Sequence, residues 1–286
     1  MTAPIPIKKQ PAKQASSLKG FRGRLLLVGA GKMGGAMLDG WLAGGLDPKN
    51  IAVLEPQPEK FVKAQVRRGL TLNPPRASAA AVIVIAIKPQ AALEIMPALR
   101  PYAGKSTLAI SIMAGRTIAF LEKSFPAGVA VVRAMPNLPA SIGRGITVAV
   151  PNRNVSKARR DLAGALLSAV GSVEWVDNER LLDAVTAVSG SGPAYVFLLA
   201  EALAAAGVAS GLPAPLAAQL ARETIAGSGE LLRRSPLDAA TLRHNVTSPG
   251  GTTAAALQVL MGPGGFETLM ETAIAVATRR SRELAG

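Results

Sequence analysis

Residues 29–34 read Gly-Ala-Gly-Lys-Met-Gly, which is the glycine spacing of a nucleotide-binding turn. They follow an apolar run and open a predicted helix, the context that makes this spacing informative. The first glycine permits a tight turn, the second lets the backbone approach a pyrophosphate, and the third lets the helix pack on the strand. The helix start offers free amides to phosphates. The predicted contacts are Gly29, Ala30, Gly31, Lys32, Met33 and Gly34. The alternative is a turn kept only for packing.

Two charged residues end predicted strands on the same side of the sheet. Glu55 comes about twenty residues after the glycine turn, where an acid can accept hydrogen bonds from the adenine ribose 2′-hydroxyl. This position favours NADH, but the nearby Lys60, Arg67 and Arg68 could reach a 2′-phosphate, and an exposed carboxylate without a ligand is a third possibility. Lys88 ends another strand at the ligand-binding edge, and a solvated surface lysine explains it equally well.

Residues 246–253, Val-Thr-Ser-Pro-Gly-Gly-Thr-Thr, can present backbone amides and hydroxyls to a small anion. A carboxylate could bind the amides at the helix start that follows, while a threonine hydroxyl bonds a reacting nitrogen. Helix capping alone is the competing interpretation. A second stretch of small residues, 189–195, also precedes a predicted helix, and a cap at a crowded interface explains it at least as well.

The residue types that are missing narrow the chemistry. There is no cysteine, which excludes disulfides, thiolate catalysis and cysteine zinc sites. No lysine follows Lys157, so the helical part lacks an acid-base lysine, and His244, the sole histidine, fits a solvated helix end better than proton transfer. The substrate should therefore supply its own electrophile. A protonated cyclic imine fits, because hydride addition then needs mainly orientation and exclusion of water. Together the two loops suggest a reductase for a small carboxylate.

The elements that position these residues form two blocks. Apolar runs of strand character alternate with helical segments up to about residue 176 and predict an α/β fold, a Rossmann-type doubly wound sheet. We expect these strands at 24–29, 51–55, 82–87, 107–112, 129–133, 146–150 and 173–176, and helices near 32–44, 58–68, 90–99, 116–124 and 154–169. Helices alone follow, at 179–188, 193–206, 213–233, 253–261 and 265–284. We predict a flexible basic tail at 1–20, a dinucleotide-binding domain at 21–176 and an all-α dimerisation and substrate domain at 177–286.

The helical block should pair with a second copy. Residues 193–206 carry apolar side chains on more than one face, and a helix that is apolar all round must be buried. About 110 residues of helix cannot easily hide that surface alone, so we expect a homodimer.

The formal net charge of +14 suits anionic ligands and raises the possibility of nucleic acid. Six of the cations lie before residue 25 without an acid: Lys8, Lys9, Lys13, Lys19, Arg22 and Arg24. Aromatic residues are 3%, too few for base-stacking platforms, so we expect no nucleic-acid partner. The start lacks a secretory signal, and charge or proline interrupts the Ala-rich segments, so we expect a cytoplasmic protein without a membrane partner.

The chain resembles the pyrroline-5-carboxylate reductase family from about residue 24 to its end. The resemblance rests on residues 29–34, on Ala-Ile-Lys-Pro-Gln at 86–90, on Arg-Ala-Met-Pro-Asn at 133–137, on residues 182–195 and on the loop 246–253. It implies reduction of 1-pyrroline-5-carboxylate to L-proline by NADPH or NADH, the final step of proline biosynthesis. It also implies homodimers that assemble further, commonly into decamers.

The resemblance also implies a set of site residues. Thr253 would hydrogen-bond the ring nitrogen as donor or proton relay, and Asn245 would contact the cofactor across the subunit interface. The substrate would lie on Ser248, Gly250, Gly251, Thr252 and Thr253. Beyond the glycine turn and Glu55, the cofactor contacts would be Asn73, Ala86, Ile87, Lys88, Pro89, Ile112, Met113 and Ala114.

Two departures from the family limit the inference. The family often carries a polar or basic residue where Glu55 stands, so the choice between NADH and NADPH stays open. Residues 234–241 read Arg-Ser-Pro-Leu-Asp-Ala-Ala-Thr in place of a Glu-His-Pro-like run, so no substrate contact carries over there. Another imine reductase and a non-catalytic nucleotide sensor remain the alternatives.

Overall fold

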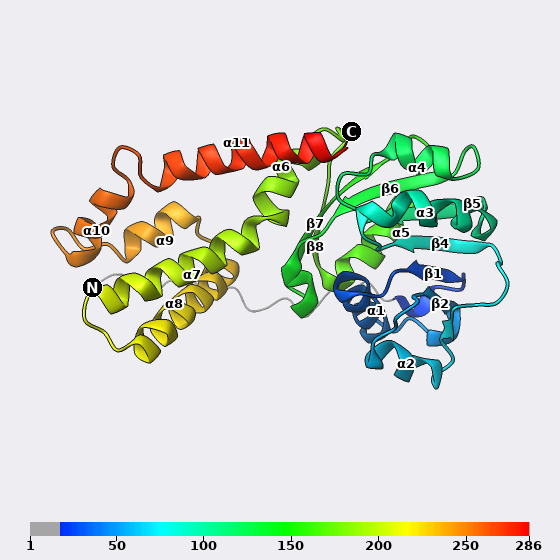
Figure 1. Cartoon of the computed structure of the whole chain (residues 1–286), viewed down its shortest axis with the longest axis horizontal. Helices are drawn as coiled ribbons and strands as arrows, with labels where there is room; N and C mark the ends of the chain where they lie inside the picture. Colours follow the sequence, from blue (N-terminus) through cyan, green and yellow to red (C-terminus); the bar gives the residue numbers. More distant parts are fainter. Residues whose placement is uncertain (1–17, 286) are drawn as a thin grey trace. The chain divides into compact units, whose positions relative to one another are not determined.

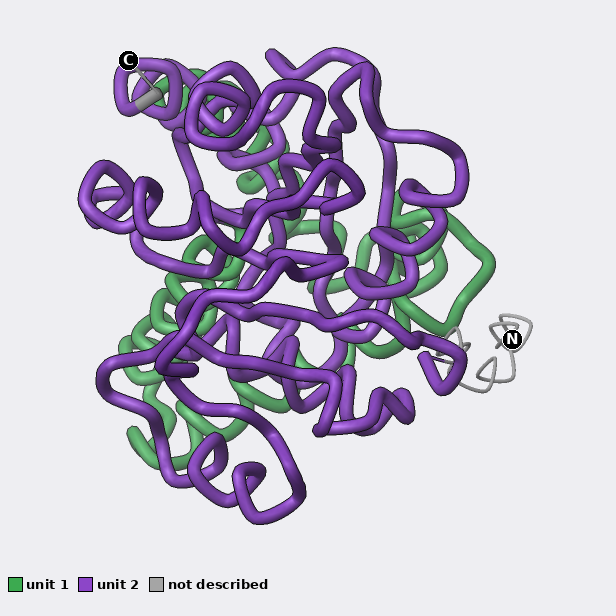
Figure 2. The backbone as a smooth tube through the Cα atoms, turned by 90° about the vertical axis from the view of Figure 1, so that its right-hand side faces the viewer, with its two compact units in different colours: residues 1–14, 192–276 green, residues 15–191, 277–286 purple. Residues whose placement is uncertain are grey.

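A computed structural model describes residues 18–285. The chain divides into two compact units, which Figure 2 colours separately. Of the described residues, one unit holds 18–191 and 277–285, and the other holds 192–276. This division falls later in the chain than the expected boundary at 177. The division into units reflects contacts within one chain and does not test where a domain begins. The boundary at 177 therefore stays a prediction.

The larger unit contains one eight-stranded sheet with the order β3-β2-β1-β4-β5-β6-β7-β8 (Figure 1). All neighbouring strands run parallel except β6 and β7, which are antiparallel. The strands are β1 (Leu25–Val28), β2 (Ile51–Leu54), β3 (Thr71–Leu72), β4 (Ala80–Ile85), β5 (Ala103–Ser111), β6 (Ala130–Met135), β7 (Gly145–Pro151) and β8 (Gly171–Trp175). This confirms the predicted Rossmann-type sheet.

Two apolar clusters, one on each face, fix the sheet between layers of helices. Helices α1 (Lys32–Ala43), α2 (Lys60–Val66) and α5 (Lys157–Leu167) pack on one face, and Trp41 on α1 is fully buried there. Its indole Nε1 donates to the Leu166 carbonyl at 2.8 Å, so this buried polar atom has a partner. Helices α3 (Ala92–Ile95) and α4 (Ile118–Ser124) cover the other face. Strands β1 and β4 are apolar throughout because both their faces are buried.

Helices make up the rest of the chain. The larger unit adds α6 (Leu181–Val185) and a π-helical turn at Thr186–Gly190. The smaller unit contains α7 (Gly192–Ala209), α8 (Ala214–Arg234), α9 (Ala239–Asn245) and α10 (Thr252–Leu260). Helix α11 (Phe266–Ala285) begins in the smaller unit, and its last residues belong to the larger one. Helices α7 and α8 pack closely, since a Cβ added at Gly207 would lie 3.2 Å from the Ala217 Cβ.

Four expectations need correction. The helix expected at 90–99 is α-helical only at α3 and continues as a 3-10 helix at Met96–Tyr102, because prolines in that segment lack the N–H that α-helical bonding requires. The short strand β3 and the helix α9 were not predicted. The separate helices expected at 179–188 and 193–206 join into one helical stretch, Leu181–Ala209. Of the tail expected at 1–20, residues 1–17 lie outside the described part, but Leu18 is buried and its amide donates to the Gly44 carbonyl at 3.2 Å.

The stretch Leu181–Ala209 has the length and hydropathy of a membrane-spanning helix, although no such segment was expected. None of its most apolar window is buried within the chain. Large apolar side chains such as Phe197 (56% exposed) and Leu198 (64% exposed) face outward. Such a surface requires a covering partner.

Candidate functional site

The glycine turn after β1 has the geometry that a dinucleotide requires. Gly29 has a φ of 86°, and a Cβ there would lie 2.7 Å from the Ala86 carbonyl oxygen, so only glycine fits. A Cβ at Gly34 would overlap the Gly29 carbonyl oxygen, which keeps α1 close to the strand. A Cβ at Gly31, in contrast, would meet no heavy atom within 4 Å. The turn is therefore closed toward the protein and open at Gly31, where a pyrophosphate would approach.

Glu55 lies directly beside this turn. Its Oε2 accepts the Ala30 backbone N–H at 2.8 Å, and its Oε1 accepts the Gln57 N–H at 3.0 Å. These bonds hold a carboxylate against the nucleotide-binding loop at the end of β2. Glu55 is half-buried and has partners, so it is not merely a solvated strand end.

Asn73, which follows β3, contacts the backbone of Glu55. Its side-chain Oδ1 accepts the Glu55 N–H at 2.9 Å, and its Nδ2 donates to the Glu55 carbonyl at 2.9 Å. Asn73 has a φ of 46°, the only positive φ of a non-glycine residue within 18–285. Its own N–H donates to the Val53 carbonyl at 2.8 Å.

Two further loops reach the same edge, because the carboxyl ends of parallel strands lie together. Residues 86–89 follow β4 and residues 112–114 follow β5. Arg116 connects these loops: its Nε and Nη2 donate to the Pro89 carbonyl at 3.1 and 2.8 Å. Its guanidinium also stacks on Phe120, 5.0 Å from the ring centre. The structure thus brings together all the predicted cofactor contacts of the larger unit, with Lys32 and Lys88 exposed.

The loop 246–253 belongs to the smaller unit. Gly250 has a φ of 69°, and the Gly251 N–H donates to the Ser248 carbonyl at 3.0 Å. Gly251 is the N-cap of α10 and has no side chain with which to cap the first turn of that helix. Ser248, Thr252 and Thr253 are exposed.

Helix α9 leads into this loop and ends at Asn245, which is half-buried. The helix begins at Asp238, whose Oδ1 accepts the Thr241 N–H at 2.7 Å. That hydrogen bond lowers the pKa of the Asp238 carboxyl from its ordinary value. At the other end, the Thr247 hydroxyl donates to the Arg243 carbonyl at 2.7 Å and fixes the start of the loop to the helix.

The small-residue stretch at 189–195 does not begin a helix, contrary to the expected cap. It lies within the continuous helical stretch and overlaps the end of the π turn, where the Ser191 N–H donates to the Thr186 carbonyl at 2.8 Å. The Thr186 and Ser189 hydroxyls donate back to the Leu182 and Val185 carbonyls at 2.7 and 3.1 Å. Hydroxyls bonded in this way stabilise the distorted turn.

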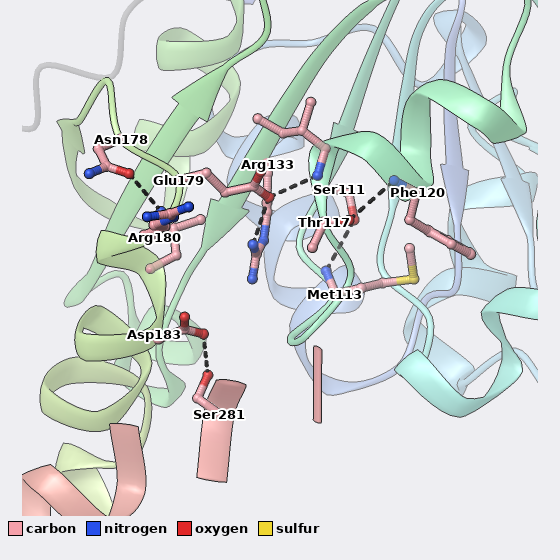
Figure 3. Close-up of polar contacts among 12 residues, drawn as sticks. Ser111, Met113, Thr117, Phe120, Arg133, Asn178, Glu179, Arg180, Asp183 and Ser281 are labelled. Carbon is pink, nitrogen blue, oxygen red and sulfur yellow. Dashed lines mark hydrogen bonds and ion pairs between the residues drawn. The ribbon is translucent and has the colours of Figure 1, made fainter. Parts of the chain in front are cut away.

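An ion pair between a buried arginine and a half-buried glutamate joins the sheet to the start of α6 and was not predicted (Figure 3). Arg133 on β6 is 5% exposed, and its Nη1 lies 2.7 Å from Glu179 Oε1. The same carboxylate oxygen accepts the Ile118 N–H at 2.8 Å, at the positive end of α4. An arginine inside the apolar run at 129–133 is a sequence signal for such a partner, because buried charges are paired.

The open glycine turn, the acid beside it and the parallel sheet define a dinucleotide-dependent oxidoreductase of the Rossmann class. A family model described as NADP oxidoreductase, coenzyme F420-dependent, matches residues 24–115. A second model, pyrroline-5-carboxylate reductase dimerisation, matches residues 179–284. The chain belongs to the pyrroline-5-carboxylate reductase family, since the family member from Pseudomonas aeruginosa is 40% identical over 265 residues, 92% of this chain and 97% of that protein.

Solved structures agree with this assignment. The chain is similar to a pyrroline-5-carboxylate reductase from Coxiella burnetii, with a TM-score of 0.85 at 34% identity over 93% of this chain and all of that one. It is also similar to the Plasmodium falciparum pyrroline carboxylate reductase solved with NADP bound, with a TM-score of 0.76 at 29% identity over 93% and 99% of the two chains. The reaction is therefore the reduction of 1-pyrroline-5-carboxylate to proline with NAD(P)H, and the enzyme is a homo-oligomer with a small-molecule substrate.

Proposed function

We propose that NAD(P)H lies along the carboxyl edge of the sheet, with its pyrophosphate at the glycine turn. The observation that carries this proposal is the open space at Gly31, beside a turn that is otherwise closed. The loops 86–89 and 112–114 and Asn73 line the same edge, and Asn245 of a second copy completes the contacts. When bound, the reduced nicotinamide supplies the hydride.

Glu55 makes NADH the preferred cofactor in this proposal. Its carboxylate can accept hydrogen bonds from the ribose 2′-hydroxyl, whereas a 2′-phosphate would meet like charge. Lys60 and Arg67 are exposed on α2 and in the following turn, and Arg68 already donates to Gln65 Oε1 at 2.9 Å. None of the hydrogen bonds to the Glu55 carboxylate comes from these cations; both donors are backbone N–H groups.

The substrate binds at the loop 246–253. Its carboxylate accepts hydrogen bonds from the first amides of α10, with Ser248, Gly250, Gly251 and Thr252 around it. The Thr253 hydroxyl hydrogen-bonds the ring nitrogen, as donor or proton relay. This proposal is supported by the exposed hydroxyls and by a helix start that no side chain caps. The protein then orients the imine and excludes water, and no strong acid or base is needed.

Assembly completes the site. We propose a homodimer formed through the outward apolar side chains of α7, with further association into a decamer. The exposed apolar side chains, together with the match to a dimerisation model, support a second copy as the covering partner of the Leu181–Ala209 stretch, rather than a membrane.

We also propose a cytoplasmic enzyme that needs no nucleic acid. Three of the six basic residues near the N-terminus lie in the described part, and they contact the chain itself. Arg22 Nη1 donates to the Lys19 carbonyl at 3.1 Å, and Arg24 bonds the Ser78 hydroxyl. Deleting residues 1–17 should leave the turnover number unchanged.

Two substitutions at Thr253 test the proposed substrate site. Thr253→Val keeps the shape and removes the hydroxyl, and it should lower kcat about 100-fold while the Kd of NAD⁺ stays constant. Thr253→Ser keeps the hydroxyl and should keep most of the activity. Full activity of the valine variant would contradict the role of Thr253. A wild-type protein that binds NAD⁺ but never turns over would instead favour the sensor.

A further inference from the structure

Glu55 directly follows β2 and lies two residues beyond the last pair of the ladder that β3 and β2 form. The register pairs Ala52 with Thr71 and Val53 with Leu72, and there the short strand β3 ends. Past this point Asn73 takes over, because its amide group bonds both the N–H and the carbonyl of Glu55. The Asn73 side chain therefore makes the two backbone hydrogen bonds that a neighbouring strand would otherwise make to Glu55.

This arrangement fixes where the Glu55 carboxylate lies. The side chain extends from a backbone held by Asn73 on one side, and it reaches the Ala30 N–H in the glycine turn on the other. The preceding carbonyl, that of Leu54, accepts the Gly29 N–H at 2.9 Å. The chain from Asn73 through Glu55 to Ala30 is continuous in hydrogen bonds.

The backbone of Asn73 indicates that the contact is specific. A φ of 46° is uncommon for a residue with a side chain, and asparagine is one of the few that tolerate it. That conformation directs the amide at Glu55 while the Asn73 N–H stays bonded to the Val53 carbonyl.

We propose that Asn73 is a positioning residue that sets the preference for NADH over NADPH by holding Glu55 in place. The inference rests on the proposed role of Glu55 as the selecting acid. It differs from the implied role of Asn73 as a direct cofactor contact, because the effect of Asn73 passes through another residue.

The test uses Asn73→Gly, since glycine keeps the positive φ and removes only the amide. Calorimetric titration of the variant without substrate should show NAD⁺ bound about tenfold more weakly, the loss expected for one hydrogen bond to a charged group. The Kd of NADP⁺ should change less than twofold. Asn50→Gly is the matched control at the opposite end of β2, where the amide bonds the Phe21 carbonyl, and it should change neither Kd.

A second variant separates this inference from the proposed function. Glu55→Ser should shift the ratio of the two Kd values toward NADP⁺, and adding Asn73→Gly to it should change that ratio less than twofold. Equal weakening of both cofactors by Asn73→Gly, persisting in Glu55→Ser, would identify a direct contact and overturn the inference. If Glu55→Ser leaves the ratio unchanged, the proposed selection by Glu55 is wrong and the inference falls with it. If only Asn73→Gly has no effect, the inference alone is wrong.

Discussion

At the carboxyl edge of the sheet, polar groups have partners within the chain, whereas along α7 large apolar side chains face outward. Glu55 is held by two backbone amides, and Arg133 is buried against Glu179. Phe197 and Leu198 are more than half exposed. The first region is organised by one chain, and in the proposed homodimer the second is covered by the partner chain. Dissociation of the oligomer should therefore weaken cofactor binding at the sheet edge less than substrate binding at the loop 246–253.

The largest effect should come from a charge in the outward face of α7. Leu198→Glu should dissociate the oligomer, because a symmetric interface contains the residue twice and each buried leucine contributes about 2 kcal/mol. Sedimentation velocity should show monomers, with turnover lost and NAD⁺ binding retained in weakened form. Ser172→Glu places the same charge on the exposed edge strand β8 and should leave the assembly intact. An oligomeric Leu198→Glu variant would show that α7 is not the interface.

The ion pair between buried Arg133 and half-buried Glu179 tests how far the stability of the larger unit depends on its polar contacts. Arg133→Met should lower the free energy of unfolding by about 3 kcal/mol, because it leaves the Glu179 carboxylate without its cation. Urea denaturation measures this loss. The exposed pair Lys157–Asp161, with side chains 90% and 64% exposed, is the matched control, and Lys157→Met should cost less than about 0.5 kcal/mol. Equal costs would mean that the burial of Arg133 has no energetic consequence.

Substitutions at two glycines of the same turn should affect stability and cofactor binding separately. Gly34→Ala should destabilise the protein by about 1 to 3 kcal/mol, because its Cβ would overlap the Gly29 carbonyl oxygen. Gly31→Ala meets no protein atom and should leave the melting temperature unchanged, yet weaken NAD⁺ about tenfold by blocking the backbone approach. Thermal unfolding and calorimetry on both variants measure the two effects. Unchanged affinity in Gly31→Ala would place the pyrophosphate elsewhere.

The smallest effect concerns the cap of α9, which leads to the substrate loop. The pKa of Asp238 is lower in the folded state, so its stabilising effect is complete above the unfolded-state pKa and is lost as the pH falls through the folded value. Asp238→Ala should speed hydrogen exchange in α9 at neutral pH, and Asp238→Asn, which keeps an acceptor, should change it less. In the wild type, the same acceleration should appear only below about pH 4. Exchange independent of the residue at 238 would contradict this cap.

Much of the fold was predictable because buried parallel strands are apolar without interruption, as in β1 and β4. The glycine turn was predictable because a side chain at Gly29 or Gly34 would clash with the backbone, and a side chain at Gly31 would block the approach of a pyrophosphate. The contact between Asn73 and Glu55 was not predictable, since the side chain of a residue that follows β3 bonds the backbone of a residue that follows β2, and no sequence pattern shows such a contact. The continuous helix at Leu181–Ala209 was missed because Ser189, Gly190 and Pro193 favour a helix start, whereas here Ser189 and Gly190 lie in a π turn and Pro193 follows it. The division at 191 depends on contacts that only the folded chain displays.

The most direct test of the account is steady-state oxidation of NADH and of NADPH by the wild-type enzyme with 1-pyrroline-5-carboxylate. The account predicts turnover with both cofactors and a kcat/KM about tenfold or more higher for NADH, because the 2′-phosphate meets the Glu55 carboxylate. Turnover with a clear preference for NADPH would contradict the assignment of Glu55. No turnover with either cofactor would contradict the account as a whole.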